Sequence, residues 1–209
     1  MRNSIFAILA IAAVSTSAFA TDLPSKTSAP EFPVSEYTET LNVISGSLTS
    51  NFVANEYDEV SDFDYTLGYT FLGLGNGIAV GGNIVANGTG VSDIEAKRVE
   101  VNTSLNVPAG FGFSTVVGGG LGYRIEEEDA YYVLNTGINY QVNDFVTLNA
   151  IGYQFRDNFD NTWQSHEVGT GVTIRVVDNV NVTTKIARSY DEDLEATSDS
   201  VTIGVGIGF

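Results

Sequence analysis

The stretch FDYTLGYTF, from Phe63 to Phe71, decides the fold. Its odd positions are all large and apolar or aromatic, and its even positions are Asp, Thr, Gly and Thr. Side chains alternate between the two faces of a β-strand, so this period of two predicts a strand with one apolar face and one polar face. The alternation recurs as far as the C-terminus, where VTIGVGIGF closes the chain from Val201 to Phe209. The sequence therefore predicts an all-β protein.

Working outward from this stretch, about ten segments show the same alternation. They are 46–57, 63–72, 78–87, 96–107, 111–125, 131–141, 145–156, 165–177, 180–190 and 200–209. Residues 41–47 could extend the first. In the seventh, Asn149 falls on the same face as Ile151 and Tyr153, which predicts a β-bulge. Each segment is close to the roughly 9–11 residues that a tilted strand needs to cross a bilayer.

The connections between these segments alternate in length. The short ones are Gly73–Gly77, Pro108–Gly110, Val142–Asp144 and Asp178–Asn179; the others are mostly longer and acidic, at 56–62, 88–95, 126–130, 157–164 and 191–199. Short turns on one side and longer loops on the other are typical of bacterial transmembrane barrels. An even strand number would place both chain ends on the short-turn side. We expect ten strands, with eight or twelve as alternatives.

The composition of the two faces favours a membrane barrel over a soluble β-sandwich, which also alternates. In a soluble sandwich the face opposite the core is charged for water. Here that face is largely Gly, Ser, Thr, Asn and Ala, which suits the interior of a narrow barrel. The other face is rich in Val, Ile, Leu, Phe and Tyr, as contact with lipid requires. The predicted fold is a closed antiparallel transmembrane β-barrel.

The N-terminal region has the features of a secretory signal. Arg2 precedes the apolar run 5–14, and Ala18-Phe19-Ala20 supplies the small–x–small pattern of a cleavage site. Residues 1–20 are therefore expected to be a signal peptide, outside the fold. Residues 21–40 hold three of the four prolines and are expected to form a periplasmic tail. The barrel domain is then 41–209. After residue 20 no apolar run is long enough for a transmembrane helix.

The bulk composition excludes several functions. The formal net charge is −17, so the chain should repel nucleic acid rather than bind it. There is no cysteine, which excludes disulfides, thiolate metal sites and cysteine nucleophiles.

The C-terminal segment resembles the assembly signal of bacterial outer-membrane proteins. The residues that carry the resemblance are alternate apolar positions and a terminal aromatic: Val201, Ile203, Val205, Ile207 and Phe209. The segment Thr21–Lys26, TDLPSK, is similar to the leader of small outer-membrane barrels and porin-family proteins. The resemblance implies a Gram-negative outer-membrane location. It also implies contact with lipid and lipopolysaccharide, and a partner in the barrel assembly machinery.

Parity assigns the charged residues that should line the lumen: Asp64, Arg98, Glu100, Arg124 and Glu167 near the outer mouth, Lys185 near mid-height and Arg175 near the periplasmic end. Such charges can pair across strands and brace the barrel, or they can line a pore and set its ion preference. At mid-height the expected inward residues are small: Gly68, Asn83, Ser104, Gly118, Gly137, Gly171 and Gly204. This small-residue waist leaves room for a thin column of water.

Signatures of an enzyme or of a bound cofactor are weak. Acidic clusters at 56–62, 126–129 and 191–195 do not match a calcium-loop pattern and are expected to form a solvated outer surface. His166 is the one histidine, and parity places it on the lipid face at the rim, which disfavours a rim protease of Asp–His type. We expect no enzyme activity, no metal and no cofactor.

Two functions follow from this fold. The first is porin-like passive passage of ions or very small solutes through a narrow lumen, with cations favoured by the acidic outer loops. The alternative is a closed structural or surface-interaction barrel that acts through those loops.

Overall fold

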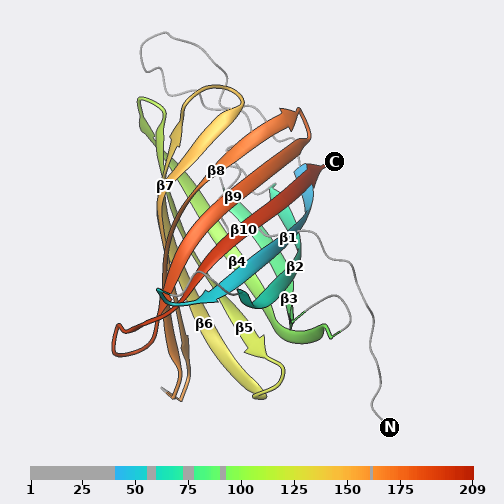
Figure 1. Ribbon diagram of the computed structural model, residues 1–209. Coiled ribbons are helices and arrows are strands. Elements are labelled where there is room, and N and C mark those ends of the chain that lie inside the picture. Colours follow the sequence, from blue (N-terminus) through green and yellow to red (C-terminus); the bar gives the residue numbers. More distant parts are fainter. Residues whose placement is uncertain (1–40, 56–59, 73–77, 90–92, 161) are drawn as a thin grey trace.

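The described part of the chain forms a closed barrel of ten antiparallel strands (Figure 1). The computed structural model describes residues 41–55, 60–72, 78–89, 93–160 and 162–209. The strands are β1 Leu41–Val53, β2 Val60–Leu72, β3 Ile78–Gly88, β4 Glu95–Gly110, β5 Phe113–Arg124, β6 Asp129–Gln141, β7 Val146–Asn158, β8 Gln164–Val177, β9 Val180–Tyr190 and β10 Ala196–Gly208. The predicted fold class and the strand number of ten are confirmed. None of the described residues forms a helix long and apolar enough to cross a membrane.

Several predicted features lie outside the described residues. They are the signal peptide 1–20, the tail 21–40 with its Thr21–Lys26 leader, the turn Gly73–Gly77, and positions 56–59 of the first acidic cluster.

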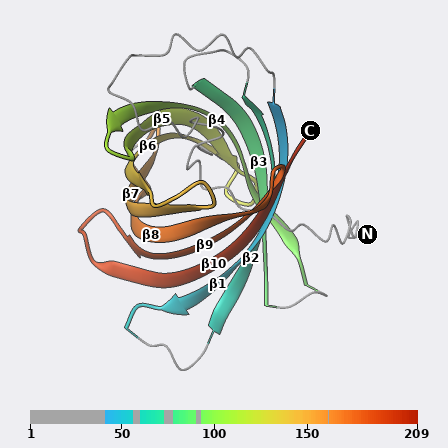
Figure 2. The ribbon, with the colours of Figure 1, turned by 90° about the horizontal axis from the view of Figure 1, so that it is seen from above.

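Each strand pairs with its neighbours in the sequence, and β1 pairs with β10 to close the barrel (Figure 2). At this seam the amide of Asn42 donates to the carbonyl of Phe209 (3.1 Å), and the amide of Phe209 donates to that of Asn42 (2.9 Å). The start of β1 and the end of the chain therefore meet on one rim, with the short connections. We call this rim the turn end and the opposite rim the loop end.

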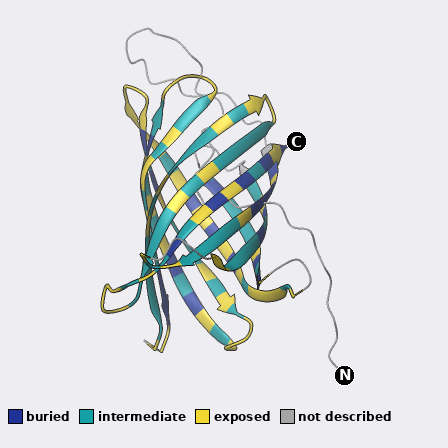
Figure 3. Cartoon of the chain, viewed as in Figure 1, coloured by how far each residue is buried: buried dark blue, intermediate teal, exposed yellow. Residues whose placement is uncertain are grey.

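The burial pattern is inverted relative to a soluble protein (Figure 3). Polar residues on the inner face are buried, among them Ser45, Ser47, Thr66, Asn102, Ser104 and Thr202. Large apolar residues on the outer face are exposed, among them Val101 (64%), Leu121 (62%) and Ile203 (57%). An exposed apolar surface that encircles the barrel calls for a hydrocarbon environment. This arrangement excludes the soluble sandwich, whose apolar face would be enclosed.

The irregularity predicted in the seventh segment is present in β7. Asn149 pairs with Gly171 of β8, and the next registered pair is Gly152 with Gly169, so Ala150 and Ile151 of β7 stand opposite the single residue Thr170. The register with β6 also shifts, between Ile138 and Asn139. Ala150 and Ile151 are both exposed, so the bulge keeps Asn149 and Gly152 on the inner face.

Several predicted boundaries differ from the structure by three residues or more: both ends of β1, the start of β2, the end of β4 and the start of β10. β1 begins at Leu41, with the extension over 41–47 that the sequence left open, because its first residues pair with the end of β2. The turn between β4 and β5 was predicted at Pro108–Gly110, yet Gly110 still pairs with Phe113. The chain reverses between this pair, at Phe111 and Gly112. The φ angles of Gly110, Phe111 and Gly112 are 88°, 52° and 81°. Flanking glycines allow this left-handed turn, and Phe111 between them is almost fully exposed.

Candidate functional site

A cavity of about 380 Å³ occupies the loop end of the lumen. Its wall carries ten charged side chains. Five are basic (Lys97, Arg98, Arg124, Arg156, Lys185) and five are acidic (Asp62, Asp64, Glu100, Glu127, Glu167). The sequence has only nine lysines and arginines against 26 acidic residues. More than half of the basic residues therefore face this one cavity, and its wall is balanced in charge although the chain as a whole is strongly acidic.

A chain of ion pairs crosses the lumen at the floor of this cavity. Arg156 of β7 donates from Nε to Oε1 of Glu100 on β4 (3.0 Å), and its Nη1 lies 3.9 Å from Oε2 of Glu167 on β8. Glu167 in turn pairs with Nζ of Lys185 on β9. We call Glu100, Arg156, Glu167 and Lys185 the charged layer. β4 and β9 lie five strands apart in the barrel order, so the layer spans the interior rather than following one wall.

Glu100 is the most enclosed member of the charged layer, at 4% exposure. Its Oε1 also accepts a hydrogen bond from the hydroxyl of Tyr131 (2.7 Å) and lies 3.5 Å from Nε of Arg98, while Oε2 accepts one from Asn83 (3.4 Å). A buried carboxylate is tolerated when its lone pairs are satisfied in this way. The layer is therefore held rigidly on the β4 side.

A second cluster lies beside the layer at the loop end. Arg124 binds Asp129 (2.8 Å) and Glu127 (3.1 Å), and its guanidinium stacks over the ring of Trp163, 4.4 Å from the ring centre. Asn158 anchors the loop that carries this tryptophan by accepting hydrogen bonds from the amides of Thr162 (2.8 Å) and Trp163 (3.2 Å). The only tryptophan of the chain is thus part of the cavity wall.

The structure brings six of the seven sequence-selected charged residues to the cavity wall: Asp64, Arg98, Glu100, Arg124, Glu167 and Lys185. Asp64 binds Lys97 (3.4 Å) and Asn87 (3.0 Å) apart from the charged layer. Arg175 lies near the turn end of β8, where its amide donates to the carbonyl of Phe145 (2.7 Å).

Sequence reasoning missed four members of the site: Arg156, Tyr131, Trp163 and Lys97, the last of which lies at a register shift between β3 and β4. The alternation of faces along a strand could have identified the first two. Phe155 faces outward, so Arg156 next to it faces inward, and Val133 on the inner face implies the same for Tyr131. Trp163 lies in a predicted loop, where alternation gives no direction.

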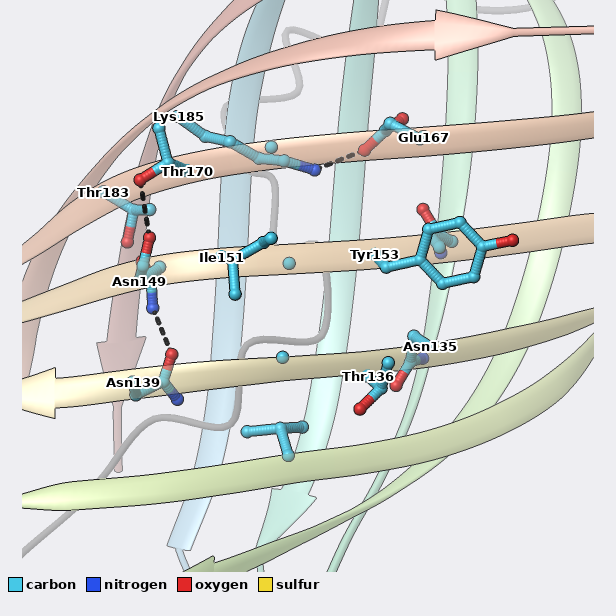
Figure 4. Close-up of a pocket in the computed structure, with 15 residues that line it drawn as sticks. Asn135, Thr136, Asn139, Asn149, Ile151, Tyr153, Glu167, Thr170, Thr183 and Lys185 are labelled. Carbon is cyan, nitrogen blue, oxygen red and sulfur yellow. Dashed lines mark hydrogen bonds and ion pairs between the residues drawn. The ribbon is translucent and has the colours of Figure 1, made fainter. Parts of the chain in front are cut away.

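Beyond the charged layer, the inner face is lined by small and polar residues. A second cavity of about 70 Å³ lies against β6, β7 and β8 (Figure 4). Several buried polar atoms on the inner face have no hydrogen-bond partner in the described part of the chain: Oγ of Ser45 and Ser47, Oδ1 of Asn83, Asn102 and Asn106, and Nδ2 of Asn139. Buried polar atoms without a protein partner are ordinarily satisfied by water.

The outer face near the loop end carries aromatic side chains and the histidine. Nδ1 of His166 and the hydroxyl of Tyr153 are 2.7 Å apart, and the imidazole lies 5.1 Å from the ring of Phe155 between ring centres. These contacts place His166 on the outer face with an aromatic group, away from the carboxylates that line the lumen. Within the described ranges no three acidic or histidine side chains are grouped so that they could hold a metal ion.

Comparison with solved structures identifies the architecture. The NanC porin superposes with a TM-score of 0.50 at 8% identity, covering 78% of this chain and 98% of that one. The chain has the fold of small bacterial outer-membrane barrels and porins. The KdgM porin in complex with disordered oligogalacturonate gives a TM-score of 0.49 at 10% identity (80% and 99% covered). The translocator domain of the autotransporter NalP from Neisseria meningitidis gives 0.48 at 11% (82% and 89% covered). No family model matches the sequence, and no curated protein matches it.

Proposed function

We propose that this barrel lies in a bacterial outer membrane and allows passive, porin-like passage of ions or very small solutes through a narrow lumen. The observation that carries the proposal is the cavity of about 380 Å³ at the loop end, whose wall is charged with both signs. Side chains that only braced the barrel could fill this end of the lumen, whereas a cavity of this size has room for several water molecules.

The inner face beyond the charged layer supports the same proposal. Serine and asparagine atoms that lack partners among the described residues favour a hydrated interior over a dry one. The charged layer crosses this path, because its ion pairs join side chains from β4 to β9. Passage is then limited to solutes that can pass beside paired charges, such as small hydrated ions.

Ion preference in this proposal has two contributions. Acidic loops at the mouth attract cations, whereas the cavity wall beneath them is balanced in charge. We therefore propose a modest cation preference that is set at the mouth and weakens at high salt, because surface charges are screened.

The test is the ion conductance of the refolded chain in planar lipid bilayers. The expected result in symmetrical KCl is small current steps that do not depend on voltage. In a KCl gradient the sign of the reversal potential should indicate a preference for cations. Neutralising the acidic loop residues Glu126, Glu127 and Glu128 together should reduce that cation preference. Absence of any current from folded protein would overturn the proposal and leave the closed surface-interaction barrel.

We also propose that the C-terminal strand is the segment read by the barrel assembly machinery. Its alternate residues Val201, Ile203, Ile207 and Phe209 are exposed on the outer face, where another protein can contact them. Replacing Phe209 with Ala should lower the amount of assembled barrel in cells while leaving refolding in detergent unchanged, because the Phe209 backbone still pairs with Asn42. Equal amounts of assembled barrel for the parent and for Phe209→Ala would contradict this role.

A further inference from the structure

The cavity at the loop end and the smaller cavity beside β7 share part of their walls. The larger cavity and the smaller one of about 70 Å³ have four lining residues in common: Gln154, Glu167, Thr183 and Lys185. Two of these, Glu167 and Lys185, form an ion pair (Figure 4). The pair therefore stands where the two cavities meet.

The smaller cavity exists because three glycines stand side by side in the wall. Gly137 of β6 pairs with Gly152 of β7, and Gly152 pairs with Gly169 of β8. Without side chains on the inner face, this row leaves a hollow beside the ion pair. It also admits the Lys185 side chain, since a Cβ on Gly169 would lie only 2.8 Å from Cε of Lys185.

The two members of the pair are held unequally. Glu167 is also 3.9 Å from Arg156, which Glu100 fixes in turn. Among the described residues, Glu167 is the only ion-pair partner of Lys185. A lysine has a flexible stem and a single ammonium, and the hollow at the glycine row lies next to it. Lys185 is thus the member with room to move, and Glu167 is the fixed one.

We propose that the Glu167–Lys185 pair determines what the lumen itself adds to the ion preference set at the mouth, with Glu167 as a fixed charge and Lys185 as its movable counter-charge. The inference rests on the proposed porin-like function and assigns the contribution of the lumen to its selectivity to one pair of side chains. Because the two charges are opposite and adjacent, the electrostatic effect of one on a passing ion is cancelled by that of the other. Loss of one charge exposes the other, and a unit charge about 4 Å from an ion in water changes the local ion concentration about fivefold.

The experiment measures reversal potentials of the refolded full chain in planar bilayers under a KCl gradient. Lys185→Met removes the ammonium and keeps most of the stem, so the potassium-to-chloride permeability ratio should rise about fivefold. Glu167→Gln should lower the ratio by a similar factor. Lys185→Arg keeps the charge and should stay within about twofold of the parent.

Arg188→Gln is the matched control. Arg188 lies three residues from Lys185 on β9, but on the opposite face, where it pairs with Asp199 (2.6 Å). It loses the same unit of charge and should leave the permeability ratio unchanged. Resistance of each variant to SDS without heating verifies that the barrel has folded.

Two outcomes overturn the inference and are distinguishable. If the parent conducts and Lys185→Met and Glu167→Gln both keep its permeability ratio within about twofold, selectivity is set elsewhere and the porin-like function survives. If neither the parent nor any variant conducts, the proposed function fails and the inference fails with it. Opposite shifts for Lys185→Met and Glu167→Gln, with no shift for Arg188→Gln, support it.

Discussion

The side chain of Tyr131 lies directly over Gly122 on the neighbouring strand and donates its hydroxyl hydrogen to Glu100 on the strand beyond. The two residues are registered partners of β6 and β5, and Tyr131 is fully buried. A Cβ on Gly122 would come within 2.2 Å of Cζ of this ring. The absence of a side chain at position 122 is what lets a tyrosine on β6 reach a carboxylate on β4.

Gly122→Ala is therefore expected to destabilise the barrel by about 1–3 kcal/mol, as overpacking of a filled interior does. Equilibrium unfolding in urea, in detergent or lipid, measures the effect. Gly152→Ala is the control, because the nearest atom to its Cβ would be 3.8 Å away, and it should be neutral or slightly stabilising. Similar losses for both variants would show that the Tyr131 contact is not the cause.

Glu100→Gln should be among the most damaging single substitutions in the lumen. It keeps the shape of the side chain but leaves Arg156 and Arg98 beside a neutral group, and breaking one partner of a buried pair costs about 3–5 kcal/mol. Glu127→Gln, which removes a half-exposed partner of Arg124, should cost about 0–1 kcal/mol. The two losses are compared by urea unfolding, and a loss for Glu100→Gln no larger than that for Glu127→Gln would contradict the network.

The inside–outside assignment of the barrel could be predicted from the sequence because it depends only on a period of two. Phe63–Phe71 and Val201–Phe209 show their faces without knowledge of any partner strand. The bulge in β7 was also visible, since Asn149 broke the parity of Ile151. The face of the strand to which a side chain points depends only on its position along that strand.

The charged layer could not be predicted in the same way, because its contacts join distant strands. Parity turns Arg156 inward, but its contact with Glu100 on β4 depends on strand stagger and barrel curvature. The position of Trp163 depends on Asn158 holding the amides of the following loop. The ends of β4 and β5 were misplaced for a related reason, since two glycines around Phe111 set the turn by their backbone conformation.

Deletion of Ala150 is expected to leave the barrel folded, because it removes the unmatched residue of the bulge and restores regular alternation between Asn149 and Gly152. Deletion of Thr136, an exposed residue of the regular strand β6, should instead exchange the faces of half that strand. Gel mobility without heating, which distinguishes folded barrels, and circular dichroism check both. If the variant without Thr136 folds and the variant without Ala150 does not, this prediction is wrong.

Charge on the outer face tests the membrane environment directly. Ile203→Lys places an ammonium near the middle of the exposed apolar surface and should cost about 2–4 kcal/mol in a lipid bilayer. Val177→Lys, at the turn end of β8, should cost about 0–1 kcal/mol. Unfolding of both variants from lipid vesicles measures the difference. Equal and small costs would mean that this surface does not contact hydrocarbon.

The seam between β1 and β10 has a consequence for how the chain must fold. Nine of the ten pairings in the described barrel join consecutive strands and can form as local hairpins. The tenth pairing joins β1 to β10. It brings the hydroxyls of Thr49 and Thr202 to within 2.8 Å of each other, although 153 positions separate these residues in the sequence. Closing so long a segment is slow, and until it happens two strand edges stay unpaired and open to aggregation. Nascent protein must therefore be kept from aggregating until β10 has been made.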